Sequence, residues 1–183
     1  MPEFYFDDPE GAGPARETSH PAFVKILQED FYYDCMDEFS PFGNDDGADT
    51  LFRLQDWYEE YGNLKDPESF LKEVIEGALG MDAQHLRLTD KNQIIKIHGN
   101  EVFLFNTIDN VIIATTFGQY KIEGKLDASL RELAQIALER QKMITQYQID
   151  NDELSLEMGG VDPMFVTYLS RLEKMQEDLQ LLK

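Results

Sequence analysis

Apolar residues recur at helical spacing through the first part of the chain. The pattern predicts a helix that begins at Pro21 and runs to about Phe39, and a second helix from about Gly47 to Tyr61. Asp66-Pro67 is typical of a helix start, because the aspartate side chain can accept a backbone N–H and proline suits the first turn. We therefore expect residues 19–80 to form a helical segment, preceded by an irregular arm, residues 1–18, that contains closely spaced prolines and glycines.

The pattern changes in the middle of the chain, where the apolar residues are β-branched or aromatic and come in short runs. Four runs predict strands: Gln93–His98, Glu101–Thr107, Val111–Phe117 and, after Gly118, Gln119–Glu123. Gly99-Asn100 and Asp109-Asn110 separate the first three runs, and both dipeptides suit tight hairpin turns. The sequence therefore predicts an antiparallel meander of three or four strands, with a helical layer covering one face.

Helical spacing returns after Gly124. A long helix is expected to begin at Asp127 or Ser129, and Asp162-Pro163 predicts the start of another. Apolar residues in this last helix alternate spacings of three and four, as in a helix-packing seam. They are Phe165, Tyr168, Leu172, Met175, Leu179 and Leu182. We expect the two helices to pack antiparallel as a hairpin; the alternative is a homodimer through the 165–182 helix.

Together these elements predict an α+β fold with N-terminal helices, a three- or four-stranded antiparallel meander and a C-terminal helical hairpin. A boundary near Gly80–Leu86 separates the acidic helical segment 19–80 from the sheet and two long helices of 84–183. Because each part is short, we expect the two to share one core.

Charge is concentrated in the first half of the chain. Lys and Arg total 16 against 36 Asp and Glu, so the formal net charge is 16 − 36 = −20. Residues 29–60 hold eleven acids and a single base, Arg53, interleaved with aromatic residues. This surface repels phosphate, which argues against nucleic-acid binding, and no uncharged apolar run is long enough to span a membrane. The acidic region is interpreted either as a solvated face or as a surface that attracts a basic partner.

The expected compartment is the cytoplasm. The N-terminus carries acids where a secretion signal needs bases and lacks an apolar stretch, and the single cysteine, Cys35, cannot form an intramolecular disulfide. Cys35 lies among Asp34, Asp37 and Glu38, and nearby anions raise a thiol's pKa. An inert or core thiol is therefore favoured over a nucleophile.

The most individual stretch of the chain is Ser40–Leu51, with the sequence SPFGNDDGADTL. Asn44, Asp45 and Asp46 precede a helical pattern, where such side chains cap the free backbone N–H groups and complement the helix dipole. Phe42 would dock into the core ahead of the helix. The alternative is a Mg²⁺ or Ca²⁺ site that uses the carboxylates of Asp45, Asp46 and Asp49. No cofactor signature accompanies either interpretation, so no cofactor is predicted.

We expect a non-enzymatic, acidic protein-binding module, either immunity-like or regulatory, that binds a basic protein through carboxylates and aromatic anchors. The candidate binding residues are Asp34, Asp37, Glu38, Phe42, Asn44, Asp45, Asp46, Asp49 and Trp57. The alternative function is a metal-dependent hydrolase that uses Asp45, Asp46 and Asp49. No catalytic residue is assigned otherwise.

Residues 20–62 resemble the bacterial YfeS-like family. The resemblance rests on His20-Pro21, on Phe31–Asp34 (FYYD) and on the Ser40–Leu51 motif. It implies a bacterial cytoplasmic protein and no particular activity. A Trp-Gly-Arg triplet, sometimes associated with that family, does not occur in this chain.

Overall fold

The structure of the chain is a computed structural model that describes residues 3–11, 13–151 and 159–183. Within those ranges the regular elements are all helical and no residue forms a strand. In chain order they are α1 (Pro21–Ile26), η1 (Asp30–Tyr33), α2 (Asp45–Tyr61), α3 (Pro67–Lys72), η2 (Glu73–Ala78), η3 (Ala83–Arg87), α4 (Lys91–Asn100), α5 (Leu104–Glu123), α6 (Ala128–Asn151) and α8 (Pro163–Leu179). Here η1 and η3 are 3₁₀-helices, and η2 is a π-helical continuation of α3.

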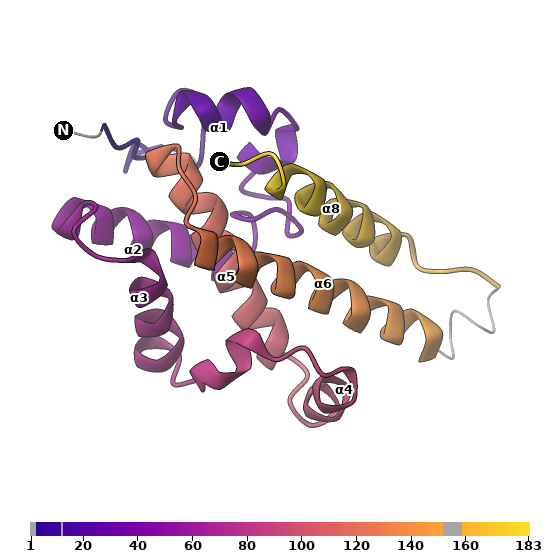
Figure 1. The fold of residues 1–183 in the computed structure, drawn as a ribbon. Coiled ribbons are helices and arrows are strands. Elements are labelled where there is room, and N and C mark those ends of the chain that lie inside the picture. Colours follow the sequence, from indigo (N-terminus) through magenta and orange to yellow (C-terminus); the bar gives the residue numbers. More distant parts are fainter. Residues whose placement is uncertain (1–2, 12, 152–158) are drawn as a thin grey trace.

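Helix α5 lies at the centre of the fold. Every residue from 111 to 122 is buried, and α1, α2, α3 and α6 all pack on this helix. Figure 1 shows α2 and α3 on one side of α5 and the α6–α8 pair on the other. The main core cluster accordingly runs from Phe23 to Leu182 and includes side chains from both halves of the chain. Among the described residues, no helix combines the length and the apolarity needed to cross a bilayer.

The predicted antiparallel meander is wrong, and so is the α+β class. Residues of the first expected strand lie in α4, and those of the other three lie mainly in α5. Helix α5 is covered by other helices along residues 111–122, so its sequence lacks the polar stripe that marks an amphipathic helix. Its short apolar runs have the same pattern as buried strands, and tertiary packing outweighs the modest helix propensity of β-branched residues. Helix α4 is largely exposed, and it was mistaken for a strand because its isoleucine run, Ile94–Ile97, is short and β-branched.

The two expected hairpin turns both lie in helices. Gly99-Asn100 forms the end of α4, so this dipeptide does interrupt regular structure. Asp109-Asn110 lies inside α5, where the buried Asp109 carboxylate pairs with Arg140 of α6. The role of Asp109 is thus set by a residue 31 positions away in the sequence.

The helix starts predicted from capping residues are confirmed. Asn44 caps α2, and the side chains of Asp66 and Asp162 accept backbone N–H groups at the starts of α3 and α8. Helices α6 and α8 run side by side as the expected hairpin (Figure 1). Leu172, Met175, Leu179 and Leu182 of the predicted seam are buried, whereas Phe165 and Tyr168 are partly buried. A homodimer through this helix stays a prediction.

The first predicted helix is too long. α1 ends at Ile26, and the chain continues through η1 and a series of turns to Ser40. Cys35, expected on an apolar helical stripe, lies instead in this irregular stretch and is exposed. The turns bring residues 29–43 across one end of α2, which determines the shape of the surface grooves described next.

Candidate functional site

The sequence-predicted binding residues do not form a single site. Trp57 is buried in the core, where its ring packs edge-on against Tyr58, Tyr61 and Phe70, and its indole N–H has no partner among the described residues. The Asp34 side chain accepts the backbone N–H of Met36, and Asp49 is exposed on α2. The remaining candidates are divided between local structural roles and two separate grooves.

Asn44 and Asp37 stabilise the backbone around the motif. The Asn44 Oδ1 accepts the Gly47 N–H at 2.8 Å, and its Nδ2 donates to the Ser40 carbonyl at 3.0 Å. Asp37 forms an ion pair with Arg171 of α8 at 3.0 Å, and it also accepts the Phe39 N–H. These contacts fix the turn before α2 and tie it to the C-terminal hairpin, as a capping role predicts.

Four of the predicted residues line a shallow polar groove, which we call the motif groove. Its volume is about 360 Å³, and it is lined by Glu38, Asn44, Asp45 and Asp46 together with Asn110 of α5 and Tyr168 of α8. The Asn110 amide donates to Asp46 at 3.4 Å, and the Tyr168 hydroxyl donates to Gln141 at 3.1 Å. Burial, followed by the negative charge of Asp109, raises the pKa of Tyr168 above its usual range. The Tyr168 phenol therefore stays protonated near neutral pH and acts as a hydrogen-bond donor.

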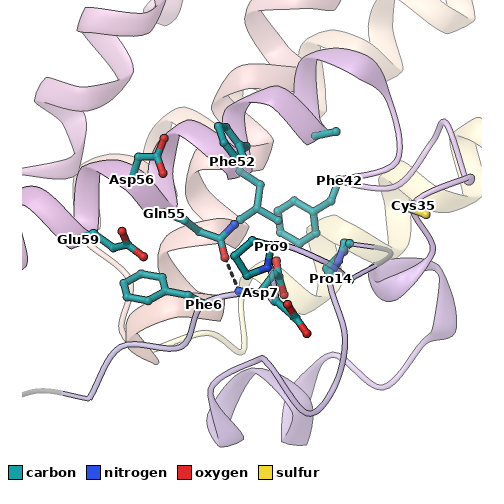
Figure 2. A pocket seen from close by; sticks show the side chains of 15 residues that line it. Phe6, Asp7, Pro9, Pro14, Cys35, Phe42, Phe52, Gln55, Asp56 and Glu59 are labelled. Carbon is teal, nitrogen blue, oxygen red and sulfur yellow. Dashed lines mark hydrogen bonds between the residues drawn. The ribbon is translucent and has the colours of Figure 1, made fainter.

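A second groove lies between the N-terminal arm and α2, and we call it the arm groove. Its volume is about 260 Å³, and its lining includes Phe6 and Asp8 of the arm, the motif residue Phe42, and Phe52, Asp56 and Glu59 of α2. Figure 2 shows Phe42 and Phe52 toward one end and Asp56 and Glu59 toward the other. Phe42 is buried, as predicted, whereas Phe52 is 64 % exposed. Phe42 and Phe52 thus form an apolar end, whereas the other end combines Asp56 and Glu59 with Phe6 of the arm, which Figure 2 shows next to Glu59.

The arm that forms one wall of this groove is held in place by buried polar contacts. The Asp7 N–H donates to the Gln55 side chain of α2 at 2.6 Å, drawn as a dashed line in Figure 2. The Asp7 carboxylate pairs with the fully buried Lys121 ammonium at 2.8 Å, and the Thr18 hydroxyl donates to the same carboxylate. Burial lowers the pKa of Lys121, and the Asp7 charge opposes that shift. Because the Lys121 ammonium compensates the charge of the Asp7 carboxylate, Asp7 contributes little to the negative charge that the groove presents.

Three other carboxylates around the arm groove keep their charge uncompensated. Asp8, Asp56 and Glu59 are exposed, and none of them forms an ion pair in the ranges that the structure describes. Asp56 and Glu59 lie three positions apart on α2, so their side chains are neighbours on the helix surface. Their charges are partly screened by solvent yet lie next to an apolar floor.

Sequence reasoning missed most of the arm groove, although a signal was present. Ala48, Phe52, Asp56 and Glu59 lie at spacings of four, four and three, on the face of α2 opposite its buried stripe. Phe52 is an apolar residue on the exposed face of this amphipathic helix, but a single exposed apolar side chain is common on protein surfaces and is therefore a weak signal. The arm side of the groove could not be predicted, because nothing local relates residues 6–14 to α2.

In the part of the chain that the structure describes, no group of three or more His, Cys, Asp or Glu side chains is arranged so that it could hold a metal ion. Asp45 and Asp49 are exposed, and Asp46 accepts a hydrogen bond from Asn110.

The described residues form an all-helical fold whose arm groove combines acidic and apolar side chains. Over 146 residues the chain is 34 % identical to "Uncharacterized protein YfeS" of Escherichia coli (strain K12), a match that covers 78 % of this chain and 58 % of YfeS. The chain is thus a homologue of YfeS, which confirms the predicted resemblance, and it spans 58 % of that relative's length. No family model and no solved structure matches the chain.

Proposed function

We propose that this chain is a non-enzymatic protein-binding module of the bacterial cytoplasm that binds a basic protein on the arm groove. The observation that carries the proposal is the juxtaposition of unpaired carboxylates with an apolar floor. Asp8, Asp56 and Glu59 form no ion pair in the described part of the chain, and they line a cavity together with Phe42 and Leu51.

The carboxylates and the apolar floor of the arm groove contribute differently to binding: the first to the association rate, the second to the affinity. A net charge of −20 attracts basic partners over distance and raises their association rate, and the effect falls with added salt. Apolar and aromatic contacts at the centre of an interface supply most of its affinity. A surface with both features is suited to a partner that is basic at the rim of its interface and apolar at the centre.

The hydrolase alternative stays a prediction and gains no specific support. Asp45 and Asp46 lie in the first turn of α2 and line the motif groove, whereas Asp49 lies one turn further along the helix and does not line it. For that reason we propose no second function.

The test compares two charge reversals of equal size. Asp56→Lys/Glu59→Lys changes the arm groove, whereas Glu76→Lys/Glu101→Lys changes two exposed residues outside it. Each tagged protein is incubated with bacterial lysate at low salt and at about 0.5 M salt, and captured proteins are quantified by mass spectrometry. Circular dichroism first checks that both variants fold.

We expect the wild type and the Glu76/Glu101 variant to retain the same basic protein, and the Asp56/Glu59 variant to lose it. Retention should fall at high salt, and in a two-component assay the purified partner should rebind the wild type and the Glu76/Glu101 variant but not the Asp56/Glu59 variant. Equal capture by both variants, or a captured set with no basic member, would overturn the proposal.

A further inference from the structure

The shape and charge of the arm groove also indicate which kind of segment of a partner protein it binds. This inference rests on the proposed function. We infer that the groove binds a short linear segment of a basic protein: one bulky apolar side chain enters the Phe42–Phe52 end, and a lysine or arginine about three residues away reaches Asp56 and Glu59. The segregation of apolar and acidic residues along one helix face carries this inference.

The apolar end is large enough for one bulky side chain. Phe42 and Leu51 are almost fully buried and form a rigid floor, and Phe52 is 64 % exposed and stands beside it. The arm groove as a whole, with its acidic end included, has a volume of about 260 Å³, compared with the roughly 150 Å³ that accommodates a benzene molecule in an engineered protein core. A phenylalanine, leucine or methionine therefore fits, with room for the aliphatic part of a neighbouring side chain.

The acidic end fits one cationic side chain. Asp56 and Glu59 lie about one turn apart on α2, and Asp8 lies across the groove on the arm. Asp7 is not available, because Lys121 already neutralises its carboxylate. Phosphate-bearing ligands and anionic lipid surfaces are disfavoured by the same three charges, so a basic peptide segment is the occupant with complementary charge.

The distance between the two ends sets the spacing within the segment. The centre of the Ala48–Phe52 region and that of the Asp56–Glu59 region are seven to eight residues apart on α2, which at ~1.5 Å per residue is roughly 11 Å. An extended chain advances about 3.3 Å per residue, so about three residues separate the apolar anchor from the base. The whole stripe from Ala48 to Glu59 is about 16 Å long, enough for roughly five extended residues.

Labelled nine-residue peptides in a glycine–serine background test the inference by fluorescence anisotropy. The two parent peptides carry phenylalanine and arginine three residues apart, one in each order. Each parent has two matched versions, one with phenylalanine replaced by alanine and one with arginine replaced by glutamate. They are titrated into the wild-type chain, Asp56→Lys/Glu59→Lys, Phe52→Ala, and a control variant, Phe103→Ala, which removes a phenylalanine that is 77 % exposed elsewhere.

We expect at least one parent to bind the wild type and the Phe103→Ala variant equally. Loss of the peptide phenylalanine should weaken binding by roughly 10- to 100-fold, the factor that corresponds to burying one large apolar side chain. The Phe52→Ala variant should lose affinity for the parent but not for the alanine version. The Asp56→Lys/Glu59→Lys variant should reverse the charge preference and bind the glutamate version more tightly than the parent.

The outcomes separate this inference from the proposed function. If basic peptides with and without the phenylalanine bind equally, the anchored-segment inference is wrong, although a basic partner still stands. If the lysate experiment yields a basic partner and no peptide binds, the inference is again overturned. If neither experiment shows binding to basic chains, both proposals fail. An NMR titration with the parent peptides locates the bound peptide, and amide chemical-shift changes that map to the motif groove instead of Phe52 and Asp56 also refute the inference.

Discussion

Replacing Asp109 with leucine would remove the carboxylate that neutralises a cation in the core. Asp109 is fully buried and Arg140 is 3 % exposed. The Arg140 Nε lies 3.1 Å from both Asp109 oxygens, and its Nη2 donates to the same carboxylate. The Arg140 Nη1 donates to the carbonyls of His85 and Leu88, both at 2.9 Å, so this one side chain connects α5, α6 and the η3–α4 connection.

The expected loss of stability follows from this burial. An arginine left buried without its carboxylate typically costs about 3–5 kcal/mol of the free energy of unfolding. The Gln141 amide would also lose its 2.6 Å acceptor on Asp109, although it keeps the Phe105 carbonyl. At roughly 2–4 °C per kcal/mol for a domain of this size, the melting temperature should fall by about 6–20 °C.

A double-mutant cycle in urea measures the effect. It compares the wild type with Asp109→Leu, Arg140→Met and the double variant, and Glu139→Gln serves as an exposed control on α6. We expect each single variant to lose several kcal/mol, the control to change by less than about 0.5 kcal/mol, and the double variant to lose clearly less than the sum of the singles. A loss below about 1 kcal/mol for Asp109→Leu, or strict additivity, would refute the reasoning.

Three further predictions concern the motif, the arm and the buried tyrosines. Gly47→Ala places a Cβ 2.2 Å from the Pro41 carbonyl oxygen and should destabilise the chain by at least about 1–3 kcal/mol in urea denaturation, whereas Gly77→Ala, with nothing within 4 Å, should not. Lys121→Met leaves the Asp7 carboxylate without its cation, so amide exchange in the arm should accelerate more than exchange in α5. Burial, then a nearby carboxylate, raises the pKa of three tyrosines, so stability present below about pH 10 should fall as the pH rises further, because the unfolded tyrosines ionise first. They are Tyr32, Tyr58 and Tyr168.

Each of these predictions has an outcome that contradicts it. Equal stabilities of the two alanine variants would show that the motif glycine is not needed for close backbone approach. Unchanged exchange in the arm of Lys121→Met would mean that the Asp7–Gln55 contact alone holds it. For the tyrosines, absorbance at high pH is compared with circular dichroism; ionisation of all tyrosines before unfolding would contradict the buried environment.

Local chemistry explains what sequence reasoning predicted correctly. The starts of α2, α3 and α8 were predicted because a cap is formed by residues within three positions of one another: Asn44 with Gly47, Asp66 with Glu68, and Asp162 with Met164. The α8 seam was readable for a similar reason, since one side of that helix faces solvent and the other faces α6. The exposed face of α8 preserves its amphipathic period, whereas in the largely exposed α4 a short isoleucine run obscured that period.

The central part of the fold was decided by tertiary contacts. Because α5 is enclosed by other helices, its sequence has no polar face, and its valine, isoleucine and threonine content suggested strands. Asp109-Asn110 lies inside α5, and the Asp109 carboxylate is paired within the core by Arg140, which is 31 positions away in the sequence. No local pattern contains that information.

The same distinction applies to the candidate site. The sequence by itself determined an acidic, aromatic-rich first half, a capped motif before α2, and a phenylalanine on the polar face of that helix. Only the tertiary structure decided which carboxylates share a groove with which apolar side chains, because the arm reaches α2 through the Asp7 contacts with Gln55 and Lys121. Charge and periodicity are carried by neighbouring residues, whereas a groove between distant segments exists only once those segments pack.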